Sequence, residues 1–396
     1  MGRPPETKRA FFSRDLGLAL LSYFLVFLSI GLFFIFPLFL DRFHPPKSQV
    51  GLVMGIHSVM AIMIRPLFGR MLDAKGGRTL STVGILLMIA ATPGFHLVGS
   101  AGILVILLRA LSGAGWGIAT TATLAMCSDL APLDRMAHSL GIIGVAGILA
   151  GAIGPTLAEE TVRRFGFGAV FNLSLIFLCA ALACVLATKD AVRFQENGRA
   201  PRRINLKNYP ATILVIIAAM PVLHGAARGT ILNFIALFGT SMGFQRIGPF
   251  FVAFSAAAIL TRLGASDLSD RYGRKRIILP AAVLISLNLF WIANVHSYGI
   301  FVLNGFISGL GQGLIFPALS TYVIDFLGQG NKGFALGLYL SLFDVGMGLG
   351  SPLYGWISDL AGYRWMYVIA GVLLLLSTVI FSLKAPRVQP AANLPQ

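Results

Sequence analysis

The groups in this sequence most able to do chemistry are charged residues inside long apolar runs. Asp344 stands near the middle of the run 333–357, deeper than any other acidic residue. A charged side chain at the centre of a bilayer costs about 2.5–3.5 kcal/mol on insertion scales, so such residues are rare and informative. A carboxyl group at that depth could load and release a proton, and we predict Asp344 as the protonation site. The alternative is a structural acid, held by a buried hydrogen bond that fixes its helix.

Three basic residues extend this candidate site. Arg109 lies about 12 Å into the run 101–127, at 1.5 Å per residue. It could couple to a proton site or to charge on a substrate, or simply donate to backbone carbonyls of a neighbouring helix. His224 and Arg228 share one face of the run 210–239, because residues four apart are neighbours on a helix. Arg228 could pair with Asp344 or bind an anionic group of the substrate. His224 could titrate together with Asp344, or it could be a packing residue. We predict that Asp344, Arg109, His224 and Arg228 couple protons.

A short polar loop between apolar runs occurs twice, at residues 65–78 and 262–276. Aligned on its first arginine, Asp73 pairs with Asp270 and Gly76 with Gly273. Glycine permits a tight turn, and a carboxylate can accept from backbone N–H groups or face the cations of its loop. We interpret each loop as a charged clasp that closes and opens between helices; the alternative is a fixed loop anchor. The predicted gating residues are Arg65, Gly69, Asp73, Arg78, Gly154, Pro155, Arg262, Asp270, Gly273 and Arg274.

Composition places these groups in a membrane protein. Apolar residues make up 56% of the chain and charged residues 12%, against about 25% charged residues in a soluble domain. The net charge of +16 does not indicate nucleic-acid binding, because the cations fall in short loops between apolar runs. With the N-terminus in the cytoplasm, about two-thirds of the Lys and Arg residues lie on the cytoplasmic side, as the positive-inside rule requires. The three cysteines, Cys127, Cys179 and Cys184, have no metal-ligand spacing and fit packing roles.

The apolar runs predict an all-α membrane protein with twelve transmembrane helices. They span 16–40, 50–70, 79–97, 101–127, 136–159, 167–188, 210–239, 247–265, 277–294, 299–325, 333–357 and 364–383. The repeat also relates residues 112–117, Ser-Gly-Ala-Gly-Trp-Gly, to residues 308–313, Ser-Gly-Leu-Gly-Gln-Gly. An internal repeat of this length is typical of transporters. We therefore divide the chain into two six-helix bundles, 1–188 and 210–396, joined by a basic linker at 189–209 that we expect in the cytoplasm with both termini.

These motifs resemble those of the major facilitator superfamily over nearly the whole chain. Gly69, Asp73, Gly76 and Arg78 are similar to the signature between helices two and three of that family, although Gly77 stands where arginine is usual. Arg109 followed by a Ser-Gly-rich run is similar to its helix-four pattern. A glycine-rich helix five that ends in Gly154-Pro155 is similar to the pattern of its proton-exchanging exporters, but Ala158 and Glu159 replace the usual Gly-Gly. The run 342–346 most resembles bacterial arabinose-efflux-type and multidrug-efflux members.

The resemblance implies two pseudo-symmetric bundles around a central cavity lined by helices one, four, seven and ten, and transport by alternating access. It implies a secondary active exporter of a small organic compound, driven by protons across the bacterial inner membrane, acting as a monomer with no cofactor. The alternatives are uptake or facilitated diffusion of a polar metabolite such as a sugar or organic anion, and a membrane scaffold or receptor. No motif of an enzyme is present, so we predict no enzymatic activity. Expected substrate-binding residues are Tyr23, Phe34, Trp116, Arg228, Asn233, Asn304 and Gln312.

Overall fold

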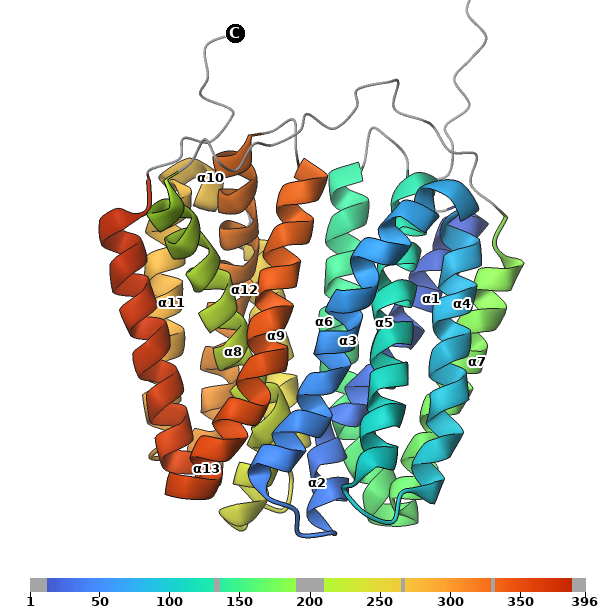
Figure 1. Cartoon of the computed structure of the whole chain (residues 1–396), viewed down its shortest axis with the longest axis horizontal. Coiled ribbons are helices and arrows are strands. Elements are labelled where there is room, and N and C mark those ends of the chain that lie inside the picture. Colours follow the sequence, from blue (N-terminus) through green and yellow to red (C-terminus); the bar gives the residue numbers. More distant parts are fainter. Residues whose placement is uncertain (1–12, 132–135, 190–209, 265–267, 329–331, 387–396) are drawn as a thin grey trace, which may run out of the picture.

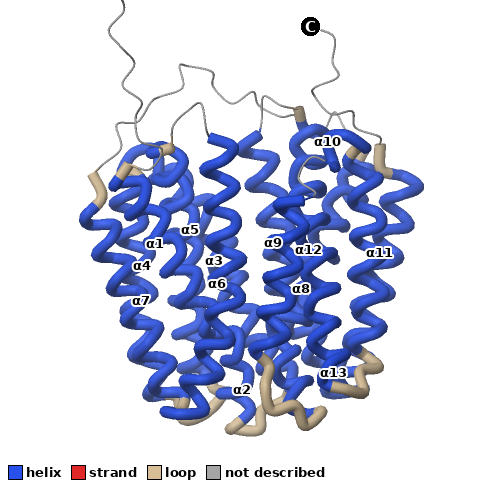
Figure 2. The backbone as a smooth tube through the Cα atoms, turned by 180° about the vertical axis from the view of Figure 1, so that it is seen from behind, coloured by secondary structure: helices blue, strands red, loops and turns tan. Residues whose placement is uncertain are grey.

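Apolar runs fold as helices in lipid because only a helix satisfies every backbone N–H and C=O group within one segment. The computed structural model describes residues 13–131, 136–189, 210–264, 268–328 and 332–386, without the side chains of residues 66, 69, 70, 73, 74, 136–141, 270, 332 and 333. Throughout these residues the regular elements are helices, with no strand among them (Figure 2).

The first half of the chain forms one group of helices. They are α1 (Arg14–Leu32), η1 (Phe33–Ile35), α2 (Phe36–Asp41), α3 (Lys47–Lys75), α4 (Gly77–Ala91), η2 (Thr92–Leu97), α5 (Ile103–Leu130), α6 (Met136–Phe165) and α7 (Phe167–Ala187). The second half comprises α8 (Ala211–Ser241), α9 (Gly248–Gly264), α10 (Leu268–Tyr272), α11 (Arg274–Ile292), α12 (Tyr298–Leu327) and α13 (Lys332–Lys384). Figure 1 shows α1–α7 on the right and α8–α13 on the left.

The predicted number of membrane crossings is confirmed in the described residues. Ten helical segments are long and apolar enough to span a bilayer, and the shorter α9 is apolar along its length. One of the ten, within α13, is broken at Gly362, where φ is 83°, and therefore makes two crossings. Together these segments give twelve.

Two glycine turns identify one end of the bundle, here called the clasp end. Gly76 has φ 85° between α3 and α4, and Gly273 has φ 94° between α10 and α11, a region that favours glycine. This confirms the tight turns predicted at both glycines. The other end of the bundle, where α2 lies and α13 turns back on itself, is here called the opposite end (Figure 1).

The glycines of the repeated Ser-Gly motif allow the same close helix packing in both halves. A Cβ at Gly113 of α5 would clash with the backbone of His57 on α3, and a Cβ at Gly309 of α12 would clash with the backbone of Phe254 on α9. Small residues of this kind let membrane helices approach closely. The glycines of α6 also lie at close contacts: Gly144 and Gly151 lie beside Arg262 and Ser255 of α9, and Gly154 packs against Gly31 of α1. The repeat is therefore visible in three dimensions as well as in sequence.

Candidate functional site

A cavity of about 160 Å³ lies between the two halves. Most of its wall is apolar or aromatic, and the polar exceptions are His57, Ser58, Arg109, Asn233 and Asp344. The predicted residues Phe34 and Trp116 also lie in the wall. A mostly apolar cavity with a few convergent polar groups is the usual form of a small-molecule site.

The cavity wall differs from the predicted set of helices. We expected helices one, four, seven and ten to line it, yet no described residue of α12, the tenth, contributes. Helices two, five and eleven, which are α3, α6 and α13, contribute instead, through residues such as His57, Gly147 and Asp344. The reason is that α3 packs against α13 and α6 packs against α9, so these pairs form the contact between the halves.

Asp344 reaches the cavity from α13 and makes an ion pair across the two halves. Its Oδ2 accepts a hydrogen bond from Nη1 of Arg65 on α3. The side chain of Asp344 is only 14% exposed. The pairing of Asp344 with Arg228 that we considered does not occur. This ion pair thus links a predicted gating arginine to the predicted protonation site.

Arg228 and its neighbour His224 have other partners. The Arg228 guanidinium lies over the ring of Phe254, 4.0 Å from its centroid, a contact between α8 and α9. His224 Nε2 lies 2.8 Å from Oε1 of Gln312 on α12. Neither His224, Arg228 nor Gln312 lies in the cavity wall. The three residues instead join helices within the second half.

Arg109 is buried in the first half, with 3% of its surface exposed. Its Nε donates to the Val53 carbonyl at 3.4 Å, and its guanidinium lies 5.6 Å from the ring centroids of Phe33 and Phe36. Its Nη2 lies 3.8 Å from the Met54 sulfur, and its Nη1 has no hydrogen-bond partner among the described residues. Both ring nitrogens of the neighbouring wall residue His57 are also unpartnered. Sequence reasoning missed His57, because a single histidine in an apolar run has no spacing signal.

Two other predicted substrate residues lie outside the wall. Tyr23 contacts Phe27, a wall residue, with ring centroids 4.4 Å apart and the two rings tilted by 34°. Asn304 is fully buried between α11 and α12, where its backbone carbonyl accepts from Asn288 at 3.1 Å. Asn304 therefore holds two helices of the second half together.

The clasps are described only in part. Gly69 lies within α3, and the side chains of Asp73 and Asp270 lie outside the described set. Arg78 donates to the Leu186 carbonyl at 2.6 Å, which ties the first clasp to α7. Arg274 donates to Asp325 at 3.0 Å and to Ser269 at 2.6 Å, in a mostly buried group of the second half.

The remaining predicted gating residues, Arg262, Gly154 and Pro155, lie at helix contacts. Arg262 lies over Phe316, 5.9 Å from the ring centroid, and beside Gly144 of the other half. Gly154 and Pro155 are buried in a continuous α6, where the approach of Gly31 places them against α1.

Two carboxylates hold the halves together at the opposite end. Glu159, near the end of α6, accepts from the N–H groups of Ile247 and Gly248 at 2.6 and 2.7 Å, at the start of α9. We call this contact the Glu159 latch. A carboxylate is favoured there because the first N–H groups of a helix have no partner within it and carry partial positive charge.

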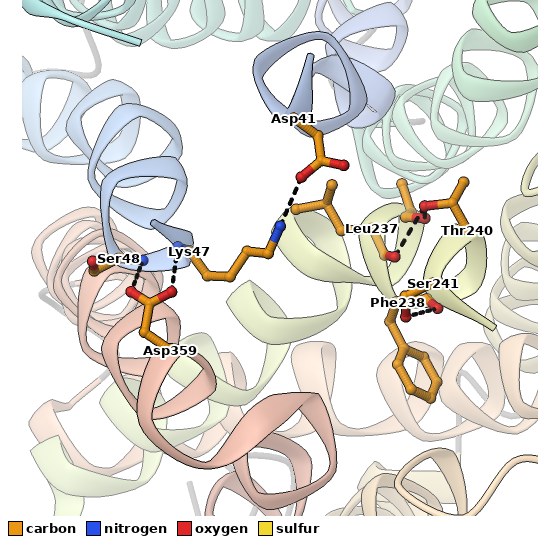
Figure 3. Close-up of polar contacts among 9 residues, drawn as sticks. Asp41, Lys47, Ser48, Leu237, Phe238, Thr240, Ser241 and Asp359 are labelled. Atoms are coloured by element: carbon orange, nitrogen blue, oxygen red, sulfur yellow. Dashed lines mark hydrogen bonds and ion pairs between the residues drawn. The ribbon is translucent and has the colours of Figure 1, made fainter. Parts of the chain in front are cut away.

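The second contact repeats the first with the halves exchanged. Asp359 of α13 accepts from the N–H groups of Lys47 and Ser48 at 2.5 and 2.8 Å, at the start of α3 (Figure 3). We call this contact the Asp359 latch. The Lys47 ammonium also donates to Asp41 at 2.7 Å. Glu159 and Asp359 are separated by the same number of residues as Ser48 and Gly248, but this separation differs from that of the repeated motifs, so the register of the repeat does not align the two carboxylates.

Comparisons with known proteins agree with this architecture. The chain is 22% identical to the staphylopine export protein of Staphylococcus aureus, over 88% of this chain and 90% of the relative. It is 24% identical to multidrug resistance protein 1 of Bacillus subtilis, over 87% and 90%.

Two solved structures share the fold. The nucleoside transporter NupG superposes with a TM-score of 0.77 at 14% identity, covering 93% of this chain and 99% of the other. The human organic anion transporter MFSD10 (TETRAN) gives a TM-score of 0.69 at 17% identity, covering 93% and 98%. The family model of the Major Facilitator Superfamily matches residues 19–261 and 217–396. This chain is therefore a transporter of the major facilitator superfamily and an integral membrane protein.

Proposed function

We propose that this transporter exports a small organic compound in exchange for protons, by alternating access across a bacterial inner membrane with both termini in the cytoplasm. The observation that carries the proposal is the ion pair between Asp344 and Arg65, because it joins the two halves at the cavity. The direction is supported by the names of two relatives, an export protein and a multidrug resistance protein.

The ion pair supplies a route from protonation to movement. Protonation of Asp344 removes the negative charge that attracts Arg65, so the contact between α3 and α13 loses its electrostatic component. A ligand or proton shifts an equilibrium between two states only through a difference in interaction energy between them. The Arg65–Asp344 pair is such a difference, since it requires α3 and α13 to be close at the clasp side of the cavity.

The opposite end supplies the second half of the cycle. In the present arrangement the Glu159 and Asp359 latches connect the halves there. We propose that these contacts break when that end opens and that the clasp end then closes. Phe34, Trp116 and Asn233, which lie in the cavity wall, would contact the substrate in both arrangements.

A flux assay tests the proposal. The protein is reconstituted in liposomes loaded with a pH-sensitive dye, a proton gradient is imposed, and lipophilic cations, sugars, and organic and amino-acid-like anions are added in turn. We expect at least one compound to collapse the gradient through wild type but not through Asp344→Asn. The matched control is Glu160→Gln, which removes an exposed carboxylate that pairs only locally with Arg163 and Arg164.

The outcome separates the proposal from the alternatives. Substrate flux that ignores the gradient would establish a uniporter and leave Asp344 with a structural role. Uphill accumulation of substrate in the same direction as proton movement down its gradient would establish proton-coupled uptake. Full coupling in Asp344→Asn would place the protonation site elsewhere.

A further inference from the structure

The cavity contains a buried cation that lacks a counter-ion among the described residues. Arg109 makes one hydrogen bond to a carbonyl, one long contact from Nη2 to the Met54 sulfur at 3.8 Å, and two contacts with aromatic rings. Its Nη1 makes no hydrogen bond. The acid of the cavity, Asp344, pairs with Arg65 instead. Buried charges in proteins are normally paired, and a buried polar atom without a partner calls for an explanation.

His57 increases the imbalance on the same side of the cavity. It lies in the wall with 7% of its surface exposed, and neither ring nitrogen has a hydrogen-bond partner among the described residues. A neutral histidine offers one N–H donor, and a protonated one offers two. The unpartnered Nη1 of Arg109 and the ring of His57 thus lie beside a space that holds no free carboxylate of the described chain.

The internal repeat shows that the fold does not require these two residues. The register of the Ser-Gly motifs places Gly305 opposite Arg109, and the register of the clasps places Phe254 opposite His57. The packing confirms this register: a Cβ at Gly305 would meet the Phe250 carbonyl, just as Arg109 contacts the carbonyl of Val53. The second half therefore builds the same helix pair with glycine and phenylalanine in place of arginine and histidine.

The remaining wall residues indicate which kind of anionic ligand could bind beside Arg109. Trp116 and Phe27 meet edge to face with ring centroids 4.6 Å apart, and Phe34, Ile30, Leu232 and Met347 complete an apolar surface. Such a surface favours an apolar or aromatic body. An anionic group attached to that body could receive hydrogen bonds from the Arg109 guanidinium, which binds carboxylates well.

We infer that Arg109 and His57 form an anion subsite, and that the transported compound is an amphipathic organic acid whose acidic group binds there while its apolar body lies against the aromatic wall. The inference deepens the proposed function and rests on it for the statement that the cavity holds the transported compound. It changes the expectation for Arg109, which becomes a substrate-binding residue rather than part of the proton path.

Three probes with one scaffold test the inference: 3-phenylpropanoate, 3-phenylpropanamide and 3-phenylpropylamine. Binding of each to the full chain in lipid nanodiscs is measured by titration calorimetry at neutral pH, without a gradient. We expect wild type to bind the propanoate at least tenfold more tightly than the amide, and to bind the amine most weakly.

Substitutions test which residues cause the preference for the propanoate over the amide. Arg109→Gln is expected to reduce the ratio of propanoate to amide affinity to about one while leaving amide binding unchanged, and Arg109→Lys to retain part of the ratio. His57→Phe introduces the residue that the repeat carries and should lower propanoate affinity alone. The control is Arg163→Gln, which removes an exposed arginine at the opposite end. Thermal unfolding without ligand checks that each variant is folded.

Each outcome decides the matter. A preference for the amine, or a preference for the propanoate that survives Arg109→Gln, would overturn the inference. Failure of all three probes to bind would also overturn it, since the wall and Arg109 would then not suffice for this class of ligand. The binding assay measures no flux. Absence of proton coupling in wild type in the liposome assay would therefore refute the proposed export mechanism and leave the binding result standing.

Discussion

The Glu159 latch offers the sharpest test of how the opposite end stays closed. Glu159→Gln keeps the size of the side chain and one acceptor oxygen, but replaces the second oxygen with an NH₂ group. In the structure Oε1 accepts from Ile247 and Oε2 from Gly248. The variant therefore loses one of the two hydrogen bonds and sets an amide donor against a backbone N–H group, so the closed arrangement is weakened without a change in packing.

The expected magnitude follows from these contacts. A hydrogen bond to a charged group contributes about 1.5–3 kcal/mol, and a negative charge at a helix N-terminus adds about 0.3–1 kcal/mol. Glu159 is half-buried, so water compensates part of the loss. We take about 1.5 kcal/mol, which corresponds to about a tenfold change in the ratio of open to closed molecules. Asp359 is exposed, and for Asp359→Asn we expect about 0.5–1 kcal/mol, or roughly two- to fivefold.

Spin labels on the two halves report the ratio of open to closed molecules. Ser100 and Asn294 are exposed at the opposite end, one in each half, and are changed to cysteine after Cys127, Cys179 and Cys184 are replaced by alanine. Double electron–electron resonance then gives the distribution of distances between the labels. We expect a longer distance to gain population in Glu159→Gln and, to a smaller extent, in Asp359→Asn.

The double variant tests whether the latches act independently. They use different helices, so their free-energy changes should add to within about 0.5 kcal/mol. The matched control is Glu160→Gln, which removes the neighbouring carboxylate that contacts only Arg163 and Arg164 in the described structure. Unchanged distance distributions in both single variants would refute the idea that these carboxylates stabilise the closed end.

Two further predictions concern stability. Gly346→Ala should lower the thermal unfolding temperature by several degrees, because its Cβ would clash with the Val222 carbonyl on α8, whereas Gly337→Ala on the same helix meets nothing within 4 Å and should be neutral. Arg274→Gln should cost about 3–5 kcal/mol of unfolding free energy, since it breaks a mostly buried ion pair with Asp325. A clearly smaller loss in chemical denaturation would show that this pair contributes little to stability.

The sequence was sufficient for the features that depend on one segment at a time. Twelve apolar runs predicted twelve crossings, and Gly76 and Gly273 predicted turns that need a positive φ. The duplicated motifs also predicted two similar halves. These features follow from length, hydropathy and local backbone freedom, which act within a single helix or turn.

Features that depend on how helices rotate against one another were harder to predict. Helical spacing correctly places His224 and Arg228 on one face, but it does not say which helix that face meets. The close approach of Gly225 to the Phe343 backbone sets the rotation of α8 against α13. In that rotation Asp344 faces Arg65 of the other half, whereas Arg228 lies over Phe254.

The latches escaped prediction for a different reason. Their acceptors, Glu159 and Asp359, are visible in the sequence, but their donors are backbone N–H groups, which every residue except proline carries. Only the topology brings the start of α9 to the end of α6, and the start of α3 to the Gly362 break. The departure from the family pattern at Glu159 was the one local signal, because a carboxylate stands where glycine is usual.

The two halves differ at positions where the cavity carries charge. Arg109 in the first half corresponds to Gly305 in the second, and by the register of Gly154 with Ser351, Asp344 in the second corresponds to Gly147 in the first. Arg109, Asp344 and Gly147 all lie in the cavity wall. Packing glycines and latches recur because both halves must fold and close in the same way. Arg109 and Asp344 each occur in only one half, so folding and closure of a half do not require them. This is the physical reason to propose that Arg109 binds substrate and Asp344 carries the proton.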